Sequence, residues 1–306
     1  MLVVYPRTLV LFQVDSRSRT VISTCEPENL KTMLSLKFRD FELPAGRKEE
    51  GVPFLGAGIF MSDGARWEHS RAMLRPNFSR AQVADLDIFE RHVNEVIAAI
   101  PKDGSTVDLQ PLFFDLTLDT STEFLFGQSA NTLMDRINGV VGENFSDSFT
   151  VCMDRIGNRI RSGFIAGFRP KNYDRSEKFV HDFADRYIQR AIEQHHVVQS
   201  GAAPAEKSGG RYIFLQELVK QTQDPLQMRA EALNILLAGR DTTASLLSCL
   251  WLTLSKRPDV WAKLLAEVDQ LDGRKPTFEE MKDMKYLRYC LNEGKSREAP
   301  KQSCPT

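Results

Sequence analysis

The stretch LLAGRDTTAS, residues 236–245, decides the fold because it lies inside the longest helical pattern of the chain. Between Pro225 and Pro258 only Gly239 weakens a helix. The sequence therefore predicts one helix over residues 225–256, about thirty residues and roughly 45 Å long. Gly, Asp and Thr suit a purely buried helix poorly, because they loosen it or compete for its hydrogen bonds. Their presence predicts an irregular helix near residues 239–243.

Small residues and hydroxyls alternate within this helix. Ala238 and Thr242 are four residues apart and share a face, and Gly239 and Thr243 form the neighbouring stripe. A Thr can bond back to the carbonyl four residues earlier. The result is a shallow trough for a flat cofactor, a small gas ligand or water, with Asp241 beside it as a proton source. The alternative is a helix-packing notch next to an exposed Arg-Asp pair.

A second candidate site lies in RWEHSR, residues 66–71. Trp67 and Arg71 are four residues apart on a predicted helix, so an indole N–H and a guanidinium face the same way. Together they suit a carboxylate ligand. The alternative is a half-buried Trp with the Arg stacked over its ring. His69 lies between them and is expected at the surface.

Composition narrows the classes of function. The 306 residues are 42% apolar and 26% charged with a net charge of −1, which is typical of a globular protein and gives no reason to expect a nucleic-acid partner. The five Cys residues are far apart and predict reduced thiols, with no disulfide and no metal site built from side chains. The longest uncharged run, residues 242–255, is too short to span a bilayer, so no membrane anchor is expected.

The remaining pattern is mostly helical. We expect a β-hairpin near residues 8–24, a helix beginning at EPENLK, and a long irregular loop over residues 44–64. Phe54, Leu55, Ile59 and Phe60 in that loop are candidates for lining a substrate channel. Further helices are expected over 66–74, 79–100, 111–127, 214–222, 259–271 and 279–293, and several more helical segments within 131–196. A flexible linker is expected at 197–210, and capping boxes are expected at 79–82 and 277–280.

Several of these stretches together resemble one family. AGRDTT, DGARWEHSRAMLRPNF, EPENLK and LDTSTEFLFG occur in the order and spacing of the cytochrome P450 superfamily, and most resemble its fungal alkane- and fatty-acid-hydroxylating group. The resemblance covers the chain up to about residue 293. It implies a mainly α fold with a small β region, the cytochrome P450 fold, incomplete at both ends. Residues 1–293 are then part of a single domain, and residues 294–306 form a tail unlike the family.

The resemblance also implies roles for residues. Thr242 matches the Thr that hydrogen-bonds dioxygen at the haem and helps deliver protons to it, and Asp241 matches its acid partner. Ala238 and Gly239 match the residues against the haem face. Trp67 and Arg71 match the clamp on the haem propionates. The implied function is a haem-thiolate monooxygenase that inserts oxygen into C–H bonds of alkanes or fatty acids.

The family also implies partners and a location. It takes electrons from an NADPH-dependent reductase, acts on lipophilic small molecules and faces the cytosol on the endoplasmic reticulum membrane. Since no anchor is recognised here, we expect a cytosolic or peripheral protein.

The family pattern stops near Gly294. Glu293 matches the family's helix Glu, but Ser296 stands where its partner Arg is expected. The loop that carries the family's Cys ligand is not found, and Cys304 lacks its context. The alternative is therefore a non-catalytic truncated product. Gly294-Lys295-Ser296 can be encoded by a string containing GTAAGT, the form of an intron donor site, so a retained intron is one origin for the tail.

A truncated product leads to two expectations. The apolar face of the last predicted helix, including Leu287 and Leu291, would lack its usual partners. The reduced, haem-reconstituted protein would show no thiolate-type Soret band with carbon monoxide, because the proximal ligand tunes the haem. A band of that type would contradict the expectation. Downstream genomic sequence without an acceptor site that restores the family's pattern would exclude the intron origin and leave a genuine truncated gene.

Overall fold

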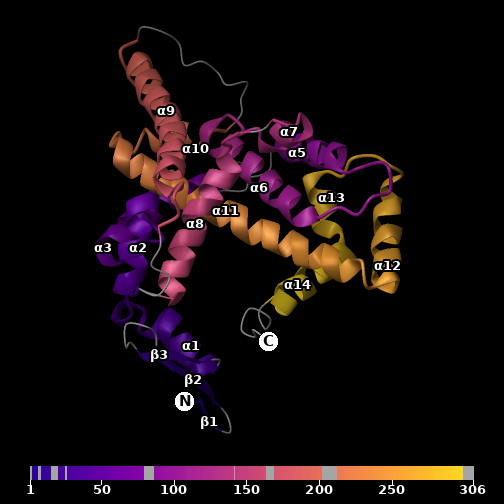
Figure 1. Ribbon diagram of the computed structural model, residues 1–306, viewed down its shortest axis with the longest axis horizontal. Helices are drawn as coiled ribbons and strands as arrows, with labels where there is room; N and C mark the ends of the chain where they lie inside the picture. Colours follow the sequence, from indigo (N-terminus) through magenta and orange to yellow (C-terminus); the bar gives the residue numbers. More distant parts are fainter. Residues whose placement is uncertain are drawn as a thin grey trace. The chain divides into compact units, whose positions relative to one another are not determined.

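The computed structural model describes residues 2–5, 8–14, 20–24, 26–78, 86–140, 142–162, 169–201 and 212–298 (Figure 1). Helices dominate them, which confirms the mainly α class. The N-terminal backbone forms a three-stranded antiparallel sheet in the order β1-β2-β3, with strands at Leu2–Tyr5, Thr8–Val14 and Thr20–Ser23. Only the backbone of these strands is described, so the small β region as a feature of the fold stays a prediction.

The helices follow in chain order. After the sheet come α1 Pro27–Lys31, the π-helix η1 Thr32–Leu36, the 3-10 helix η2 Phe38–Asp40, α2 Ala45–Leu55, α3 Gly64–Leu74 and η3 Arg75–Phe78. The middle of the chain contains α5 Leu86–Ala99, α6 Leu109–Phe126, α7 Thr132–Ile137, α8 Phe145–Ser162 and α9 Tyr173–Gln199. The last part contains α10 Phe214–Leu218, α11 Pro225–Leu254, α12 Pro258–Val268, η5 Asp269–Leu271, α13 Phe278–Asp283 and α14 Lys285–Glu298.

The chain divides into two compact units. The first unit comprises Met1–Asn77, Glu143–Glu206 and Leu215–Asn234. The second comprises Phe78–Gly142, Lys207–Phe214 and Ile235–Thr306. Helix α11 contributes its first turns to the first unit and the rest of its length to the second.

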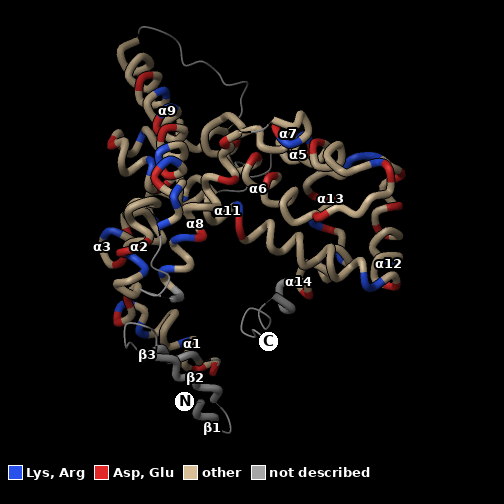
Figure 2. The backbone as a smooth tube through the Cα atoms, viewed as in Figure 1, with Lys and Arg blue, Asp and Glu red and all other residues tan. Residues whose placement is uncertain are grey.

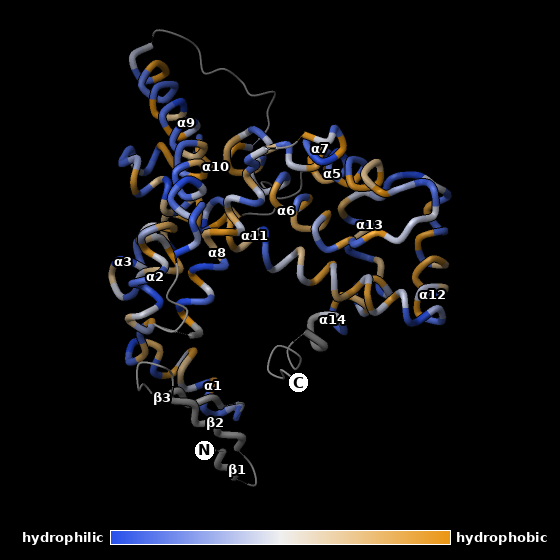
Figure 3. Tube along the Cα trace, viewed as in Figure 1, coloured by the Kyte–Doolittle hydropathy of each residue, from blue (hydrophilic) through white to orange (hydrophobic). Residues whose placement is uncertain are grey.

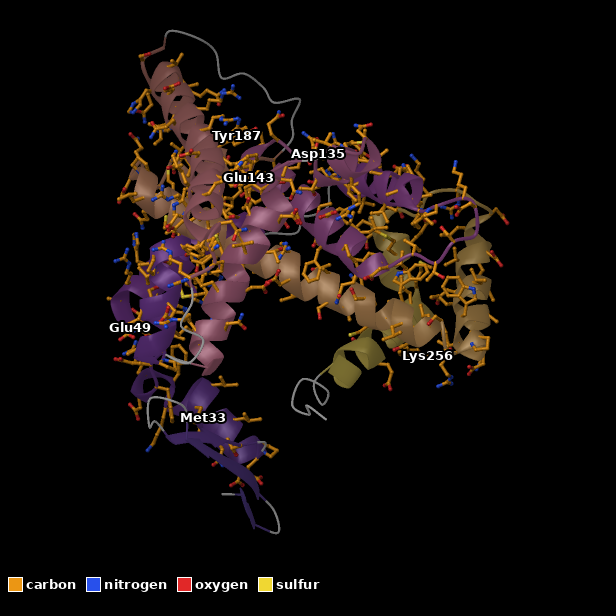
Figure 4. All side chains as sticks on the ribbon, in the orientation of Figure 1. Met33, Glu49, Asp135, Glu143, Tyr187 and Lys256 are labelled. Carbon is orange, nitrogen blue, oxygen red and sulfur yellow. The ribbon has the colours of Figure 1, made fainter. Side chains whose placement is uncertain are left out.

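Helices α8 and α9 form the core of the first unit. The largely hydrophilic α9 carries charges of both signs (Figures 2 and 3) and buries residues at helical spacing, namely Val180, Ala184, Ile188 and Ala191. Phe145 of α8 meets Phe183 of α9 with ring centroids 4.7 Å apart. Glu143, labelled in Figure 4, accepts a hydrogen bond from Nε of Arg175 at 2.7 Å and ties the start of α8 to α9.

The expectation of an irregular loop over residues 44–64 was wrong for its first half, which forms α2. The segment contains two Gly and a Pro, so its own helix propensity is low, and tertiary contacts override that preference. Phe54 and Leu55 are buried in the core at 1% and 0% exposure. The buried Glu50 accepts hydrogen bonds from Nε and Nη2 of Arg159 on α8 at 3.1 and 3.0 Å.

The long helix is confirmed. Helix α11 runs unbroken for 30 residues and begins after Asp224, whose carboxylate accepts from the amide of Leu226 at 3.0 Å. It stays α-helical through residues 239–243, so the irregularity expected there is not found. Among the described residues, no helix is both long enough and apolar enough to cross a bilayer.

Local signals placed several other helix ends correctly. Helix α6 ends at Gly127 in the left-handed region (φ 73°), and the capping box at Thr277 and Glu280 is present with both of its hydrogen bonds. The helix expected over 279–293 is interrupted at Met284, and α14 continues to Glu298. Some expected features lie outside the described residues. They are the capping box at 79–82, most of the linker at 197–210, Cys25 and Cys304.

The expectation of exposed apolar surface at Leu287 and Leu291 was also wrong. Both are partly buried, and they pack against a cluster formed by Leu250, Leu254, Leu264 and Cys290. The amides of Tyr286 and Leu287 donate to the carboxylate of Glu267 on α12 at 2.9 and 2.8 Å. The first turns of α14 are therefore held by both apolar and polar contacts. The idea of a truncated product stays a prediction.

The close approach of Gly56 to α11 gives a stability prediction. Gly56 has φ 72°, and an added Cβ would lie 2.5 Å from Cβ of Ala230, whereas Gly64 in the same unit has φ 57° with nothing within 4 Å. Gly64→Ala should cost about 1–2 kcal/mol of backbone strain. Gly56 also has ψ 171°, a conformation that is essentially confined to Gly, so Gly56→Ala should cost about 1–3 kcal/mol of strain and ~1–3 kcal/mol more through overpacking. Urea unfolding of the two variants measures this. Equal losses of unfolding free energy would contradict the contact.

Candidate functional site

The predicted back-bond of Thr242 is present on α11. Its Oγ1 donates to the carbonyl oxygen of Ala238 at 2.8 Å, and the Thr242 side chain is otherwise exposed. Because the hydroxyl proton is used inside the helix, Thr242 presents oxygen lone pairs outward. This orientation needs no partner from another helix.

The Arg240–Asp241 pair beside Thr242 is not the exposed pair that the helix-packing alternative expects. Arg240 is buried at 4% exposure, and its guanidinium carbon lies 4.6 Å from the centroid of the Phe114 ring. Its Nη1 donates to Oδ1 of the half-buried Asp241 at 2.8 Å. The carbonyl oxygen of Arg240 accepts from Oγ1 of Thr117 on α6 at 3.0 Å. Helix α6 therefore holds Arg240 in place, and Arg240 in turn holds Asp241.

Gly239 serves helix packing. A Cβ added there would lie 2.6 Å from Oγ of Ser121 on α6 and 3.6 Å from its Cβ. The absent side chain thus lets α6 approach α11 closely. Gly239 also borders a cavity. The packing alternative therefore accounts for its contact with Ser121, and the trough accounts for its place at the cavity.

The cavity lies within the second unit and has a volume of about 390 Å³. Its wall is mainly apolar, with four aromatic rings and several hydroxyls, and is formed by Phe78, Ile88, Phe89, Thr117, Thr120, Ser121, Phe124, Leu125, Tyr212, Ile235, Ala238, Gly239 and Thr243. Of the residues expected to contact a cofactor, Ala238 and Gly239 are here. Thr243, which belongs to the predicted trough, also lines the cavity. The sequence did not predict the other lining residues, because they come from η3, α5, α6, an earlier turn of α11 and the segment before α10.

The expected channel lining of Phe54, Leu55, Ile59 and Phe60 is not part of this cavity. Phe54 and Leu55 belong to the core of the first unit, where Phe54 stacks on His181 with ring centroids 5.5 Å apart. Burial lowers the pKa of His181, whose Nε2 lies 2.8 Å from the carbonyl oxygen of Phe54. Phe54 and Leu55 therefore stabilise the fold, because they are buried in this core.

Trp67 and Arg71 lie on α3 in the first unit. The guanidinium carbon of Arg71 is 5.4 Å from the indole centroid, and Phe38 packs on the same indole with centroids 5.2 Å apart. This is the stacked arrangement named above as the alternative. The guanidinium remains exposed, and no carboxylate of the described residues forms an ion pair with Arg71. It can therefore stack on Trp67 and still bind an anionic ligand. His69 is exposed, as expected.

A buried carboxylate contacts the inward side of α3. Glu231 on α11 is 1% exposed, and its Oε1 accepts from Oγ of Ser70 at 2.5 Å. Its Oε2 accepts from the amide of Ile59 at 3.2 Å. Burial raises the pKa of Glu231, and the two hydrogen bonds oppose that rise. No local sequence pattern indicates this contact, because Ser70 and Glu231 are 161 positions apart in the chain.

A second buried polar network joins α5 to α6. Both ring nitrogens of His92 face carboxylates, with Nδ1 2.7 Å from Glu95 and Nε2 2.8 Å from Glu123. Arg91 also pairs with Glu123. Ligand atoms of His92, Glu95 and Asp119 lie within 4.8 Å of one another, a spacing that a metal ion can bridge. All three already have hydrogen-bond partners, so we assign the network to stabilising the helices.

Asp119 completes this network by capping α7 from another helix. Its Oδ1 accepts from the amide and the hydroxyl of Thr132, and its Oδ2 accepts from the amide of Leu133, each at 2.9 Å. Asn131, the N-cap residue, makes no side-chain cap of its own. Burial raises the pKa of Asp119, and these hydrogen bonds oppose that rise.

Comparison with known proteins identifies related sequences. The model of the family described as Cytochrome P450 matches residues 7–294. Cytochrome P450 monooxygenase fsdH of Fusarium heterosporum is 41% identical over 293 residues, 92% of this chain and 51% of that protein. Cytochrome P450 52A5 of Candida maltosa and Cytochrome P450 52-E3 of Starmerella bombicola are each 42% identical, covering 89% of this chain and 54% of those proteins. The chain thus spans about half the length of these relatives.

The contact between Gly239 and Ser121 gives a prediction for a double-mutant cycle. In a helix interior Ala is favoured over Gly by about 1 kcal/mol, but in the native background the new Cβ meets Ser121 Oγ at a cost of ~1–3 kcal/mol. Gly239→Ala should therefore bring no gain in unfolding free energy by itself. In a Ser121→Ala background it should stabilise the protein by about 1 kcal/mol. Identical effects in both backgrounds would show that Gly239 does not serve this contact.

Proposed function

Because the chain belongs to the cytochrome P450 family, we propose that it supplies the oxygen-handling part of a haem-dependent monooxygenase acting on alkanes or fatty acids. The observation that carries the proposal is the face of α11, where Ala238 and Gly239 border an apolar cavity one turn from an exposed, oriented Thr242 hydroxyl. The substrate class rests on the resemblance to the fungal group.

The residues present fit the family's cofactor. When bound, haem supplies the activation of dioxygen. Arg71 has an exposed guanidinium without a carboxylate partner among the described residues, which suits a propionate. Ala238 and Gly239 leave space beside the helix for a flat apolar group. The clamp belongs to the first unit and the cavity to the second, so each supports the proposal independently.

Thr242 and Asp241 handle protons in this proposal. The lone pairs of Thr242 Oγ1 accept a hydrogen bond from a protonated ligand or a water, because the hydroxyl proton is donated to Ala238. Asp241 receives a proton from solvent at its half-buried carboxylate and passes it on through water. The ion pair with Arg240 keeps that carboxylate near Thr242.

The partners and location are part of the same proposal. The electrons come from an NADPH-dependent reductase, and the substrate is a lipophilic small molecule. The protein acts at the cytosolic side of the endoplasmic reticulum membrane, as implied by the resemblance. No nucleic-acid partner is proposed, since the net charge is near zero.

The clamp gives a binding prediction. Arg71→Gln should weaken binding of hemin to this chain roughly tenfold, as for the loss of one charge-assisted contact. Hemin dimethyl ester, whose propionates carry no charge, should bind the native chain and the variant equally. Quenching of Trp fluorescence measures both dissociation constants.

Arg175→Gln is the matched control, because Arg175 in the same unit is paired with Glu143. It should leave both affinities unchanged. If Arg71→Gln weakens the ester as much as hemin, Arg71 does not recognise propionate. If the native chain binds neither ligand, the haem proposal for these residues is wrong.

A further inference from the structure

One buried carboxylate joins three separate elements of the first unit. Glu231 on α11 accepts from the hydroxyl of Ser70 on α3 at 2.5 Å and from the amide of Ile59 in the preceding loop at 3.2 Å. Both oxygens are in use, and the side chain is 1% exposed. A carboxylate offers two acceptors at this position, whereas an amide side chain would offer one acceptor and one donor.

The position of Ser70 makes the contact relevant to the clamp. At 100° per residue, Ser70 is about 60° from Trp67 on one side and about 100° from Arg71 around the helix axis. Ser70 is buried at 1% exposure and Arg71 is exposed. The hydrogen bond to Glu231 holds Ser70 on the inward side of α3, where Met73 and Leu74 are also buried, and the indole and the guanidinium project from the rest of the helix surface.

The neighbouring Asn234 holds the loop before α3 and the end of α2, but not α3. Its Oδ1 accepts from the amide of Phe60 at 2.9 Å, and its Nδ2 donates to the carbonyl oxygens of Leu55 and Ala230 at 3.0 and 2.7 Å. None of these groups is on α3. Among the hydrogen bonds of the described residues, the one between Glu231 and Ser70 is the side-chain link from α11 to this helix.

Charge on α3 favours the ionised carboxylate. Arg66 and His69, both exposed on α3, lower the pKa of Glu231, as do the hydrogen bonds from Ser70 and Ile59. Burial acts in the opposite direction and is the largest effect. The carboxylate depends on its hydrogen bonds, because a buried acceptor without them is costly.

We propose that Glu231 is a positioning residue that, through Ser70, orients α3 so that Trp67 and Arg71 receive a haem propionate. The inference rests on the proposed function, because it assumes that these two residues form a propionate clamp. Glu231 itself touches no ligand. Its effect is on the preference of the chain for a charged propionate, not on the apolar contacts of the ligand.

The test measures that preference directly. We define the propionate preference as the dissociation constant of hemin dimethyl ester divided by that of hemin, both from Trp fluorescence quenching of the full chain. Ser70→Ala should lower it roughly fivefold, as for the loss of one net hydrogen bond. Glu231→Gln should lower it by no more than that, because the Ser70 hydroxyl can also accept a hydrogen bond from the new amide. The double variant should lower it no further than Ser70→Ala alone, because both changes act on the same link.

Glu50→Gln is the matched control. Glu50 is another buried carboxylate of the first unit, joining α2 to α8 through Arg159. It should reduce the free energy of unfolding without changing the propionate preference, which separates positioning from general loss of stability. If Glu231→Gln does not fold, Ser70→Ala carries the same test.

The outcomes are distinguishable. A native chain that prefers hemin, with an unchanged preference in both Glu231→Gln and Ser70→Ala, overturns this inference and leaves the clamp intact. An equal fall in the Glu50→Gln control also overturns it, because the effect then follows stability. A native chain with no preference overturns the clamp and, with it, this inference.

Discussion

The continuity of α11 is the constraint on which the other features depend. An unbroken helix of 30 residues fixes the spacing and direction of every side chain along it. Its first turns carry Glu231 and Asn234, which hold the loop before α3 and α3 itself. Its middle carries Ala238 and Gly239 at the cavity. A break in this helix would change the arrangement within both units.

Buried polar side chains form much of the specific contact between helices. Glu231 joins α11 to α3, Glu50 joins α2 to α8, and Asp119 of α6 caps α7. Each carboxylate is satisfied by two or more donors, as burial requires. These contacts are directional, so they specify the rotation of a helix where apolar packing alone leaves it less defined. That property matters most for α3, where rotation decides what Arg71 faces.

Features with a local cause could be predicted from the sequence. The length of α11, the Gly127 stop and the capping box at Thr277 each depend on a few neighbouring residues. Helix α2 could not be predicted, because its own helix propensity is low. Its stability comes from the burial of Phe54 and from the contact with the distant Arg159. The cavity wall could not either, since its residues come from segments far apart in the chain.

The same distinction applies to Thr242 and to the Trp67–Arg71 pair, each taken within its own unit. Thr242 is oriented by the carbonyl of Ala238 on its own helix, so the motif AGRDTT contains both its chemistry and its geometry. The motif Trp-x-x-x-Arg contains the chemistry of the clamp but only part of its geometry. Stacking on Trp67 orients Arg71 relative to α3, while Ser70 of α3 is hydrogen-bonded to Glu231 on the long helix. Under our proposal, a search for such a motif finds the two residues proposed to contact the ligand and misses Glu231, the residue proposed to position them.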